Sequence, residues 1–188
     1  MRARPPPRRL RFNRVDNDAR LAGMGRRRHS PDDRNAWAEF SPCGRWRYAL
    51  GRRWGPGPGL VFVLLNPSTA DHLTPDATLL RCVARAQGLG FGALRVVNLF
   101  AWRATDPRAL GRVPDPVGPE NDAAIGRAAR WGKSILCGWG ARGGLAGRDS
   151  DVRRLLRRRP LWHLGLTAGG QPRHLLYVAG DVVPRLWA

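Results

Sequence analysis

The stretch that decides the fold is Leu60-Val61-Phe62-Val63-Leu64-Leu65-Asn66-Pro67-Ser68-Thr69-Ala70-Asp71. Half of its six consecutive apolar residues are β-branched or aromatic, which is typical of a strand buried on both faces of a parallel sheet. Pro67 cannot donate a hydrogen bond to a sheet and disfavours the α region for Asn66, so the strand ends where polar side chains appear. Ligands of open α/β sheets bind at the carboxyl ends of strands, and the stretch therefore predicts a site as well as a fold.

The rest of the chain alternates between helical and strand patterns. Thr74-Pro75-Asp76-Ala77 has a capping hydroxyl and a proline suited to the first helical position, and it predicts a helix that ends at Gly88 or Gly90. Further strands are predicted at 94–100, 134–137 and 161–165, with helices at about 120–130 and from 149 onward. This alternation predicts an α/β fold of three layers (α/β/α) around a four-stranded parallel sheet.

An extra antiparallel edge strand is predicted at residues 46–50, where apolar and polar side chains alternate. The glycine and proline cluster at 55–59 then predicts a turn, through which this strand would pair with the 60–65 strand. The chain of 188 residues with 43% apolar content fits one domain, which we place at 35–188. Residues 1–34 are rich in Arg, Pro, Gly and Asp, so we expect a disordered basic tail.

The formal net charge is +19, and Lys133 is the only lysine. A basic, arginine-rich surface attracts polyanions, because the guanidinium fork bonds phosphate bidentately. Nucleic acid, with DNA first, is therefore the expected partner, although genomic base composition is an alternative reason for arginine in place of lysine. A helix that starts near Asp149 adds an outward-facing arginine cluster, which is either an ordinary solvated face or a phosphate-facing surface: Arg153, Arg154, Arg157, Arg158 and Arg159.

Cys43, Cys82 and Cys137 are an odd number without paired spacing, and the sequence has no zinc-ligand set. We expect reduced thiols, no metal and no cofactor. No apolar run approaches the length of a membrane span, and the N-terminus lacks the apolar region of a signal peptide. These features predict a soluble cytoplasmic protein that does not contact a membrane.

Polar side chains fall at the ends of several predicted strands, and parallel strands bring their carboxyl ends to one edge. Asn66, Ser68 and Asp71 follow one strand, Asn98 lies at the end of the next, and His174 lies beyond the last. The amide of Asn98 matches the donor and acceptor pattern of a nucleobase edge. Each residue also has a structural alternative, namely an Asx turn, a satisfied buried amide or a loop histidine. The sequence shows no Ser-His-Asp spacing or phosphate-binding loop.

The chain closely resembles the bacterial and phage family called domain of unknown function 1643, over about 46–178. The resemblance is carried by five segments: 65–71 (LNPSTAD), 97–107 (VNLFAWRATDP), 115–122 (DPVGPEND), 139–140 (WG) and 164–174 (LGLTAGGQPRH). Leu175 stands where a proline typically follows the histidine. The family name implies no activity.

A more remote resemblance is to the uracil-DNA glycosylase superfamily, in which Asn66-Pro67 matches the turn that places the water-activating residue. This resemblance implies that Asn98 reads a flipped base, that Asn66 positions water with help from Asp71, and that His174 stabilises the departing base. The Pro-Ser that follows the histidine in those enzymes is missing here. The remaining expected site residues are Ser68, Phe100 and Trp102 at the base, and Arg103 and Arg173 at the phosphates.

Three functions remain open at this point. The first is a nucleic-acid base-processing enzyme that hydrolyses an N-glycosidic bond, in the manner of a DNA glycosylase. The second is a non-catalytic module that binds nucleic acid through its arginines. The third is an enzyme that acts on a free nucleotide or nucleoside.

Overall fold

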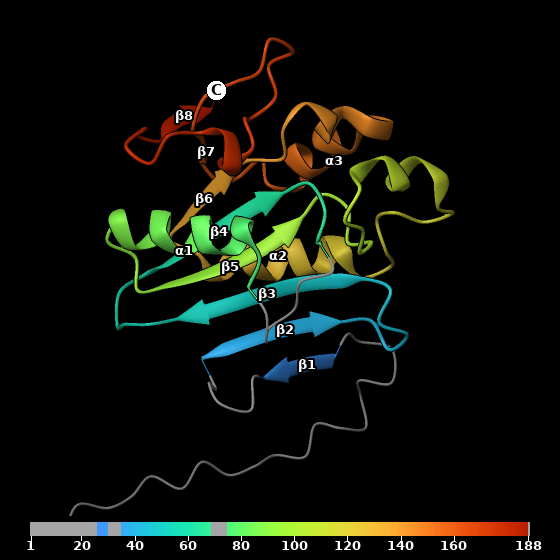
Figure 1. The fold of residues 1–188 in the computed structure, drawn as a ribbon, viewed down its shortest axis with the longest axis horizontal. Coiled ribbons are helices and arrows are strands. Elements are labelled where there is room, and N and C mark those ends of the chain that lie inside the picture. Colours follow the sequence, from blue (N-terminus) through green and yellow to red (C-terminus); the bar gives the residue numbers. More distant parts are fainter. Residues whose placement is uncertain (1–25, 30–34, 69–74, 188) are drawn as a thin grey trace, which may run out of the picture.

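The computed structural model describes residues 26–29, 35–68 and 75–187 of the chain. Within these ranges the chain forms eight strands, three α-helices and several short 3₁₀ helices (Figure 1). In chain order, the elements are β1 (Arg26–His29), β2 (Ala36–Phe40), β3 (Arg47–Arg53), β4 (Gly59–Leu64), α1 (Ala77–Gly88), β5 (Ala93–Asn98), η2 (Pro107–Arg112), α2 (Asn121–Trp131), β6 (Ser134–Cys137), η3 (Ala141–Gly147), α3 (Arg148–Leu155), β7 (Leu161–His163), η4 (Leu175–Tyr177) and β8 (Arg185–Trp187).

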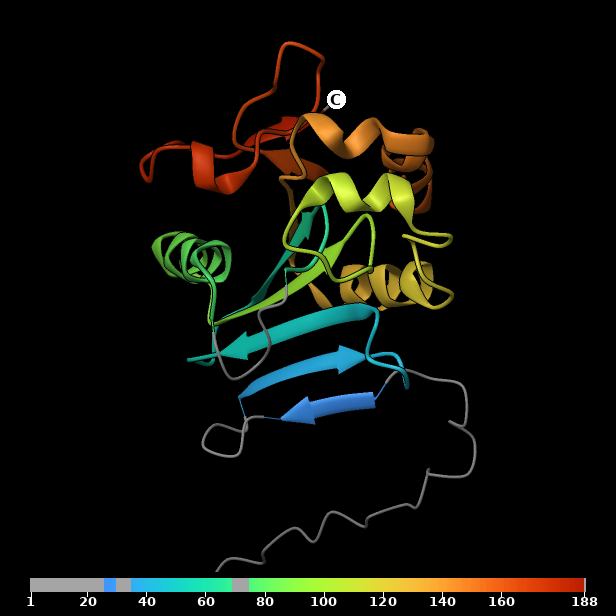
Figure 2. The same ribbon diagram turned by 45° about the vertical axis from the view of Figure 1, so that its right-hand side comes forward.

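All strands belong to one mixed sheet with the order β1-β2-β3-β5-β4-β6-β7-β8. The four strands predicted from the sequence form its centre, and β5, β4, β6 and β7 are mutually parallel. The α/β class is confirmed, but the prediction of a sheet of four parallel strands is wrong. Antiparallel strands extend both ends of the sheet, with β3, β2 and β1 at one end and β8 at the other (Figure 2).

The predicted partner of the 46–50 strand is also wrong. This segment belongs to β3, which pairs antiparallel with β5 and not with β4, and Leu50 lies opposite Val96. Both neighbours of β4 are parallel strands, β5 and β6, so neither edge of β4 is left for β3. Residues 26–29, which the sequence assigns to the disordered tail, form β1 against β2. The rest of the predicted tail lies outside the described residues.

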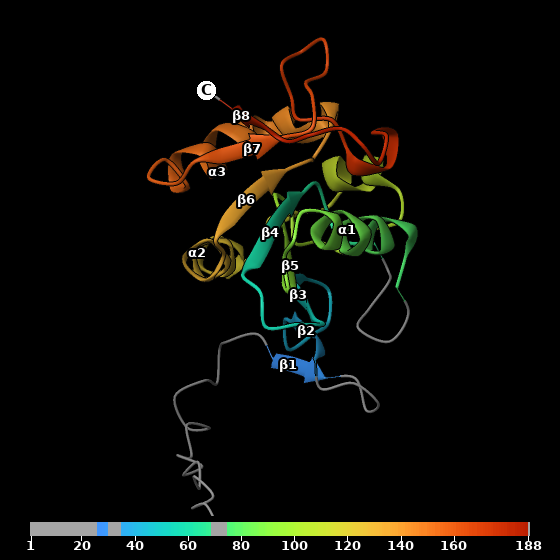
Figure 3. The ribbon, with the colours of Figure 1, turned by 90° about the vertical axis from the view of Figure 1, so that its left-hand side faces the viewer.

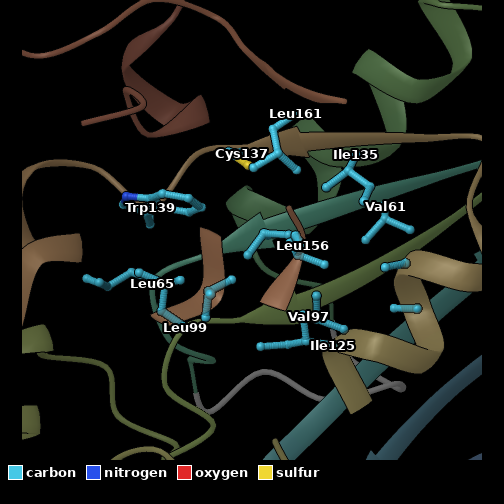
Figure 4. Packing of buried hydrophobic residues seen from close by; sticks show 14 of the residues in the cluster. Val61, Leu65, Val97, Leu99, Ile125, Ile135, Cys137, Trp139, Leu156 and Leu161 are labelled. Carbon is cyan, nitrogen blue, oxygen red and sulfur yellow. The ribbon is translucent and has the colours of Figure 1, made fainter. Parts of the chain in front are cut away.

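Helices cover both faces of the sheet (Figure 3). On one face, α1 and η4 pack on the even-numbered side chains of the central strands, such as Phe62, Leu64 and Val96. On the other face, α2 and α3 pack on the odd-numbered side chains, such as Val61 and Val97 (Figure 4). All six residues of β4 are buried, as a strand between two helix layers requires. None of the helices in the described ranges is long and apolar enough to cross a membrane.

The connections around β4 determine where a ligand can bind. The chain passes from β4 through α1 to β5 on one side, and from β5 through α2 to β6 on the other side of β4. The strand order reverses at β4, and such a switch point leaves a crevice outside the carboxyl ends of the strands. The helix at this crevice begins differently from the prediction. Asp76 is the N-cap of α1 and accepts a hydrogen bond from the Leu79 amide, whereas Thr74 lies outside the described residues.

Candidate functional site

A pocket of about 430 Å³ occupies this crevice. Its walls come from the carboxyl ends of β4, β5 and β6, the first turns of α1, the start of β3, the loop before η2, and η4. Four residues that the sequence assigns to a site line the pocket: Asn66, Ser68, Asn98 and His174. These residues span more than a hundred positions of the chain, and the parallel sheet brings them together at one edge as predicted.

Asn66 lies just after β4, where Pro67 turns the chain out of the sheet. Its Nδ2 group donates to the carbonyl of Ala104 at 2.8 Å and to that of Pro67 at 3.1 Å. Both amide hydrogens are therefore engaged, and they fix the orientation of the side chain. The Oδ1 atom has no hydrogen-bond donor among the described residues, so it remains available to accept a hydrogen bond from a molecule in the pocket.

Asn98 is the last residue of β5, and its side chain is buried, with 2% of its surface exposed. Its backbone carbonyl accepts a hydrogen bond from Asn121. The side-chain amide, in contrast, lines the pocket and has no hydrogen-bond partner within the described ranges. Because this amide opens onto the pocket, it can donate hydrogen bonds to, and accept them from, a molecule that binds there.

Asp76 joins two walls of the pocket. Its Oδ2 atom accepts a hydrogen bond from the Ser68 hydroxyl at 2.6 Å, and its Oδ1 atom accepts one from the Leu79 amide at 2.7 Å. The carboxylate thus links the segment after β4 to the first turn of α1. The sequence predicted a helix start here without assigning Asp76 to the site. The available signal was topological, because a helix that directly follows a strand begins at that strand's carboxyl end.

His174 forms the opposite wall, immediately before η4. The Nδ1 atom accepts a hydrogen bond from the Leu176 amide at 3.3 Å, so the neutral ring carries its proton on Nε2. Burial lowers the pKa of His174, and the nearby Asp76 carboxylate opposes that shift. The histidine therefore enters the pocket as a neutral hydrogen-bond donor at neutral pH. Tyr177 lies against it, with the ring centroids 5.9 Å apart.

Three further pocket residues were missed by the sequence analysis. Arg47 is buried at the start of β3, Arg142 is exposed on η3, and Cys82 is fully buried on α1. Burial, aided by the charge of Asp76, raises the pKa of Cys82 far above its usual range. Its thiol stays protonated and is not a nucleophile. Arg47 was missed because β3 was expected at the edge of the sheet, beside β4, and not next to β5.

Four predicted residues lie elsewhere. Phe100 is buried and packs in the core on the α2 face. Trp102 contacts Trp46 edge to face at a centroid distance of 5.6 Å. Arg103 lies over the ring of Phe40 and donates to the Gly44 carbonyl at 3.3 Å.

Arg173 is exposed and follows Pro172, away from the pocket lining. Asp71 lies outside the described residues. No group of His, Cys, Asp and Glu side chains that could hold a metal ion occurs in the ranges that the structure describes.

A second buried asparagine explains part of the 115–122 motif. Asn121, the first residue of α2, donates from Nδ2 to the carbonyls of Asn98 at 3.0 Å and Leu99 at 2.9 Å. Arg148 donates to the same Leu99 carbonyl at 2.8 Å and pairs with Asp122. These contacts hold the end of β5 from behind, so the motif supports the pocket without lining it.

The fold and this pocket define an α/β protein with a pocket at the switch point of a mixed sheet. The chain belongs to the family described as protein of unknown function (DUF1643), whose sequence model matches residues 47–176. This match confirms the first resemblance, with nearly the predicted limits. No curated protein and no solved structure matches the chain.

Proposed function

We propose that the pocket receives a nucleobase and that the protein hydrolyses its N-glycosidic bond, with nucleic acid, DNA first, as the substrate. The observation that carries the proposal is the Asn98 amide, which is buried, lines the pocket and has no hydrogen-bond partner among the described residues. An amide offers a donor pair and an acceptor in one plane, as the edge of a base requires. The pocket volume of about 430 Å³ suits a base or nucleoside.

The other polar groups of the pocket suit the steps of hydrolysis. Asn66 Oδ1 accepts a hydrogen bond from a water molecule, whose oxygen attacks C1′ of the sugar. The bond between C1′ and the base nitrogen breaks, and its electron pair stays on the base. The Nε2–H of neutral His174 then donates a hydrogen bond to the anionic base.

The proton that the water loses needs an acceptor, and Asp76 is the carboxylate among the described pocket residues. The base finally takes a proton from solvent and Asp76 returns its own proton to solvent, which completes the hydrolysis. The remote resemblance to uracil-DNA glycosylases assigns the same roles to Asn66, Asn98 and His174, and it assigns help with the water to Asp71. Asp76 is thus a second candidate for that role.

The two alternatives use the same pocket. A free nucleoside would need only the pocket and no long basic surface. A non-catalytic module would use the Asn98 amide for recognition and would not need Asn66. The hydrogen bonds of Asp76 favour the non-catalytic alternative, because both of its carboxylate oxygens already accept hydrogen bonds from the protein.

The test is release of free base from single- and double-stranded DNA that contains uracil, hypoxanthine or modified pyrimidines. We expect Asn66→Ala to lower release by roughly 100-fold, a typical effect of losing a group that positions a reactant. Asn98→Asp should change which base is released, because it replaces two donors with acceptors. Asn35→Ala is the matched control, since Asn35 is exposed and lies outside the pocket.

Two results would contradict this proposal. If DNA binds but no base is released from any substrate, the pocket recognises bases without catalysis. If only free nucleosides are cleaved, the third alternative is correct. Release that is equal in the wild type and in Asn66→Ala would remove Asn66 from the mechanism.

A further inference from the structure

A second cavity, of about 680 Å³, lies between the end of α3, the start of β7 and β8. We call it the arginine groove. It is lined by Arg153, Arg157, Arg158 and Arg159, together with Trp187 and a few apolar residues. None of the described residues that line it is acidic. The groove therefore concentrates positive charge on a concave surface, which strengthens its attraction for anions.

Several arginines have clear structural roles, both outside the groove and within it. Arg127 forms an ion pair with Glu39 at 2.5 Å, and Arg148 pairs with Asp122. Within the groove, Arg159 donates to backbone carbonyls of the segment that precedes β6.

Arg153, Arg157 and Arg158 are exposed and have no salt bridge to a described carboxylate. Arg153 lies in the last turn of α3, Arg157 and Arg158 follow the end of that helix, and all three line the groove. The carboxylate of Asp151 lies 3.5 Å from Arg154, which does not line the groove. The guanidinium groups of Arg157 and Arg158 therefore line the groove with no carboxylate partner among the described residues, and they can bind an anion there.

An aromatic ring is built into the same groove. The guanidinium carbon of Arg153 lies 4.5 Å from the ring centroid of Trp187. Trp187 also packs against Trp139, with the ring centroids 5.3 Å apart. Trp139 lines the nucleobase pocket, so one pair of rings connects the groove with the wall of the pocket. Arginines beside aromatic rings are typical of surfaces that bind single-stranded nucleic acid.

We propose that the arginine groove binds the phosphates of a single-stranded nucleic acid, as a site separate from the nucleobase pocket. This inference rests on the proposed function only in taking nucleic acid as the substrate class. Guanidinium groups bond phosphate oxygens bidentately, and a concave cationic surface attracts the successive phosphates of a nucleic-acid strand. The exposed side chain of Leu186 at the edge of the groove provides apolar contact for sugars or bases.

The test measures binding of the full-length protein to a labelled oligothymidylate of about 20 nucleotides by fluorescence anisotropy across a salt series. The groove variant carries Arg153→Ala, Arg157→Ala and Arg158→Ala. The matched control carries Arg45→Ala, Arg81→Ala and Arg112→Ala, which removes the same charge from exposed positions elsewhere. Thermal unfolding followed by circular dichroism checks that both variants fold.

We expect the groove variant to bind at least about tenfold more weakly at about 0.1 M salt, and the control less than about threefold. The slope of log K against log salt should fall by about 2 in the groove variant, because three phosphate contacts are lost. Replacement of the same three arginines by lysine should restore most of the slope, since the charge returns.

Two outcomes would overturn the proposal. Equal weakening in the groove variant and the control would mean that overall charge, not the groove, binds the strand. Tighter groove-dependent binding to phosphatidylserine vesicles than to the oligonucleotide would assign the groove to a membrane surface. Base release is a separate readout. Groove-dependent binding without base release refutes only the hydrolase, and base release with an unimportant groove refutes only this inference.

Discussion

Two buried asparagines meet at the end of β5 and differ in what their amides do. Behind the strand, on the α2 side, Asn121 donates to the carbonyls of Asn98 and Leu99. In front, on the α1 side, the amide of Asn98 faces the pocket with no partner among the described residues. Both side chains are almost fully buried. Burial alone therefore does not distinguish a structural amide from a candidate ligand-binding one. The difference lies in the Nδ2 groups, because that of Asn121 donates to two carbonyls, whereas the Oδ1 atom of Asn121 has no partner among the described residues.

The largest difference should appear when each asparagine is replaced by alanine. Asn121→Ala removes two hydrogen bonds and leaves buried carbonyls with fewer donors, so we expect a loss of about 2–4 kcal/mol in the free energy of unfolding. Asn98→Ala removes no hydrogen bond to a described residue and should cost less than about 1 kcal/mol. Urea denaturation followed by circular dichroism measures both. Equal losses would show that Asn98 is a structural amide as well.

The next largest effect concerns Trp139, which belongs both to the core behind the sheet and to the pocket wall. A Cβ atom added at Gly143 would lie 2.0 Å from Cδ1 of this ring, whereas one added at Gly144 would meet nothing closer than 3.9 Å. Gly143→Ala should therefore cost about 1–3 kcal/mol through overpacking. It should also disturb the hydrogen bond from Trp139 Nε1 to Gln171.

Gly144→Ala is the control from the adjacent position, and it should change the free energy of unfolding little. Thermal unfolding and the tryptophan fluorescence spectrum of the two variants test the pair. A Gly144→Ala variant that is as unstable as Gly143→Ala would mean that the conformation of η3, not contact with Trp139, requires glycine.

Asp76 combines the two roles that separate Asn121 from Asn98. Its carboxylate lines the pocket and also accepts hydrogen bonds from the protein. Asp76→Ala removes the N-cap of α1 and the partner of Ser68, so we expect a loss of about 1–2 kcal/mol. Asp106→Ala removes the corresponding cap of η2, which is exposed, and should cost clearly less. Thermal unfolding of both variants compares them. If Asp106→Ala lowers the free energy of unfolding as much as Asp76→Ala does, the Asp76 cap stabilises the fold no more than an exposed cap.

The sequence predicted the centre of the fold because β4, β5, β6 and β7 are buried runs whose pattern is local. The antiparallel strands at the two ends of the sheet were harder to predict from the sequence. The pairing of β3 with β5 depends on which edge remains free after β4 has two parallel neighbours, and no short pattern contains that information. β8 is exposed at two of its three residues, so it has no apolar run that would indicate a strand.

The sequence predicted which residues meet at the pocket where their positions depend on strand ends, as with Asn66 and Asn98. The predictions failed where they depended on side-chain direction in a loop. After β5, the amides of Leu99 and Phe100 bond to the carbonyls of Leu64 and Leu65, which turns the chain across the end of β4. The Phe100 ring thereby enters the core behind the sheet instead of the pocket. Sequence spacing does not specify such a turn.

His174 should show the smallest effect on stability, and a dependence on pH that Asn121 on the other side of β5 cannot show. Burial lowers its pKa below the ordinary value of 6.5, so the unfolded chain binds this proton more readily than the folded chain. The free energy of unfolding is therefore retained above pH 6.5 and decreases as the pH falls through the pKa of the folded state. His174→Gln removes this titrating group, so its free energy of unfolding should change less between about pH 7 and pH 5 than that of the wild type.

Urea denaturation at a series of pH values measures how the free energy of unfolding of each protein depends on pH, with pH 8 as the reference at which the wild-type imidazole is neutral in both states. Parallel profiles would mean that His174 is as accessible to protons in the folded protein as in the unfolded chain, and a neutral Nε2–H donor in the pocket would no longer be supported.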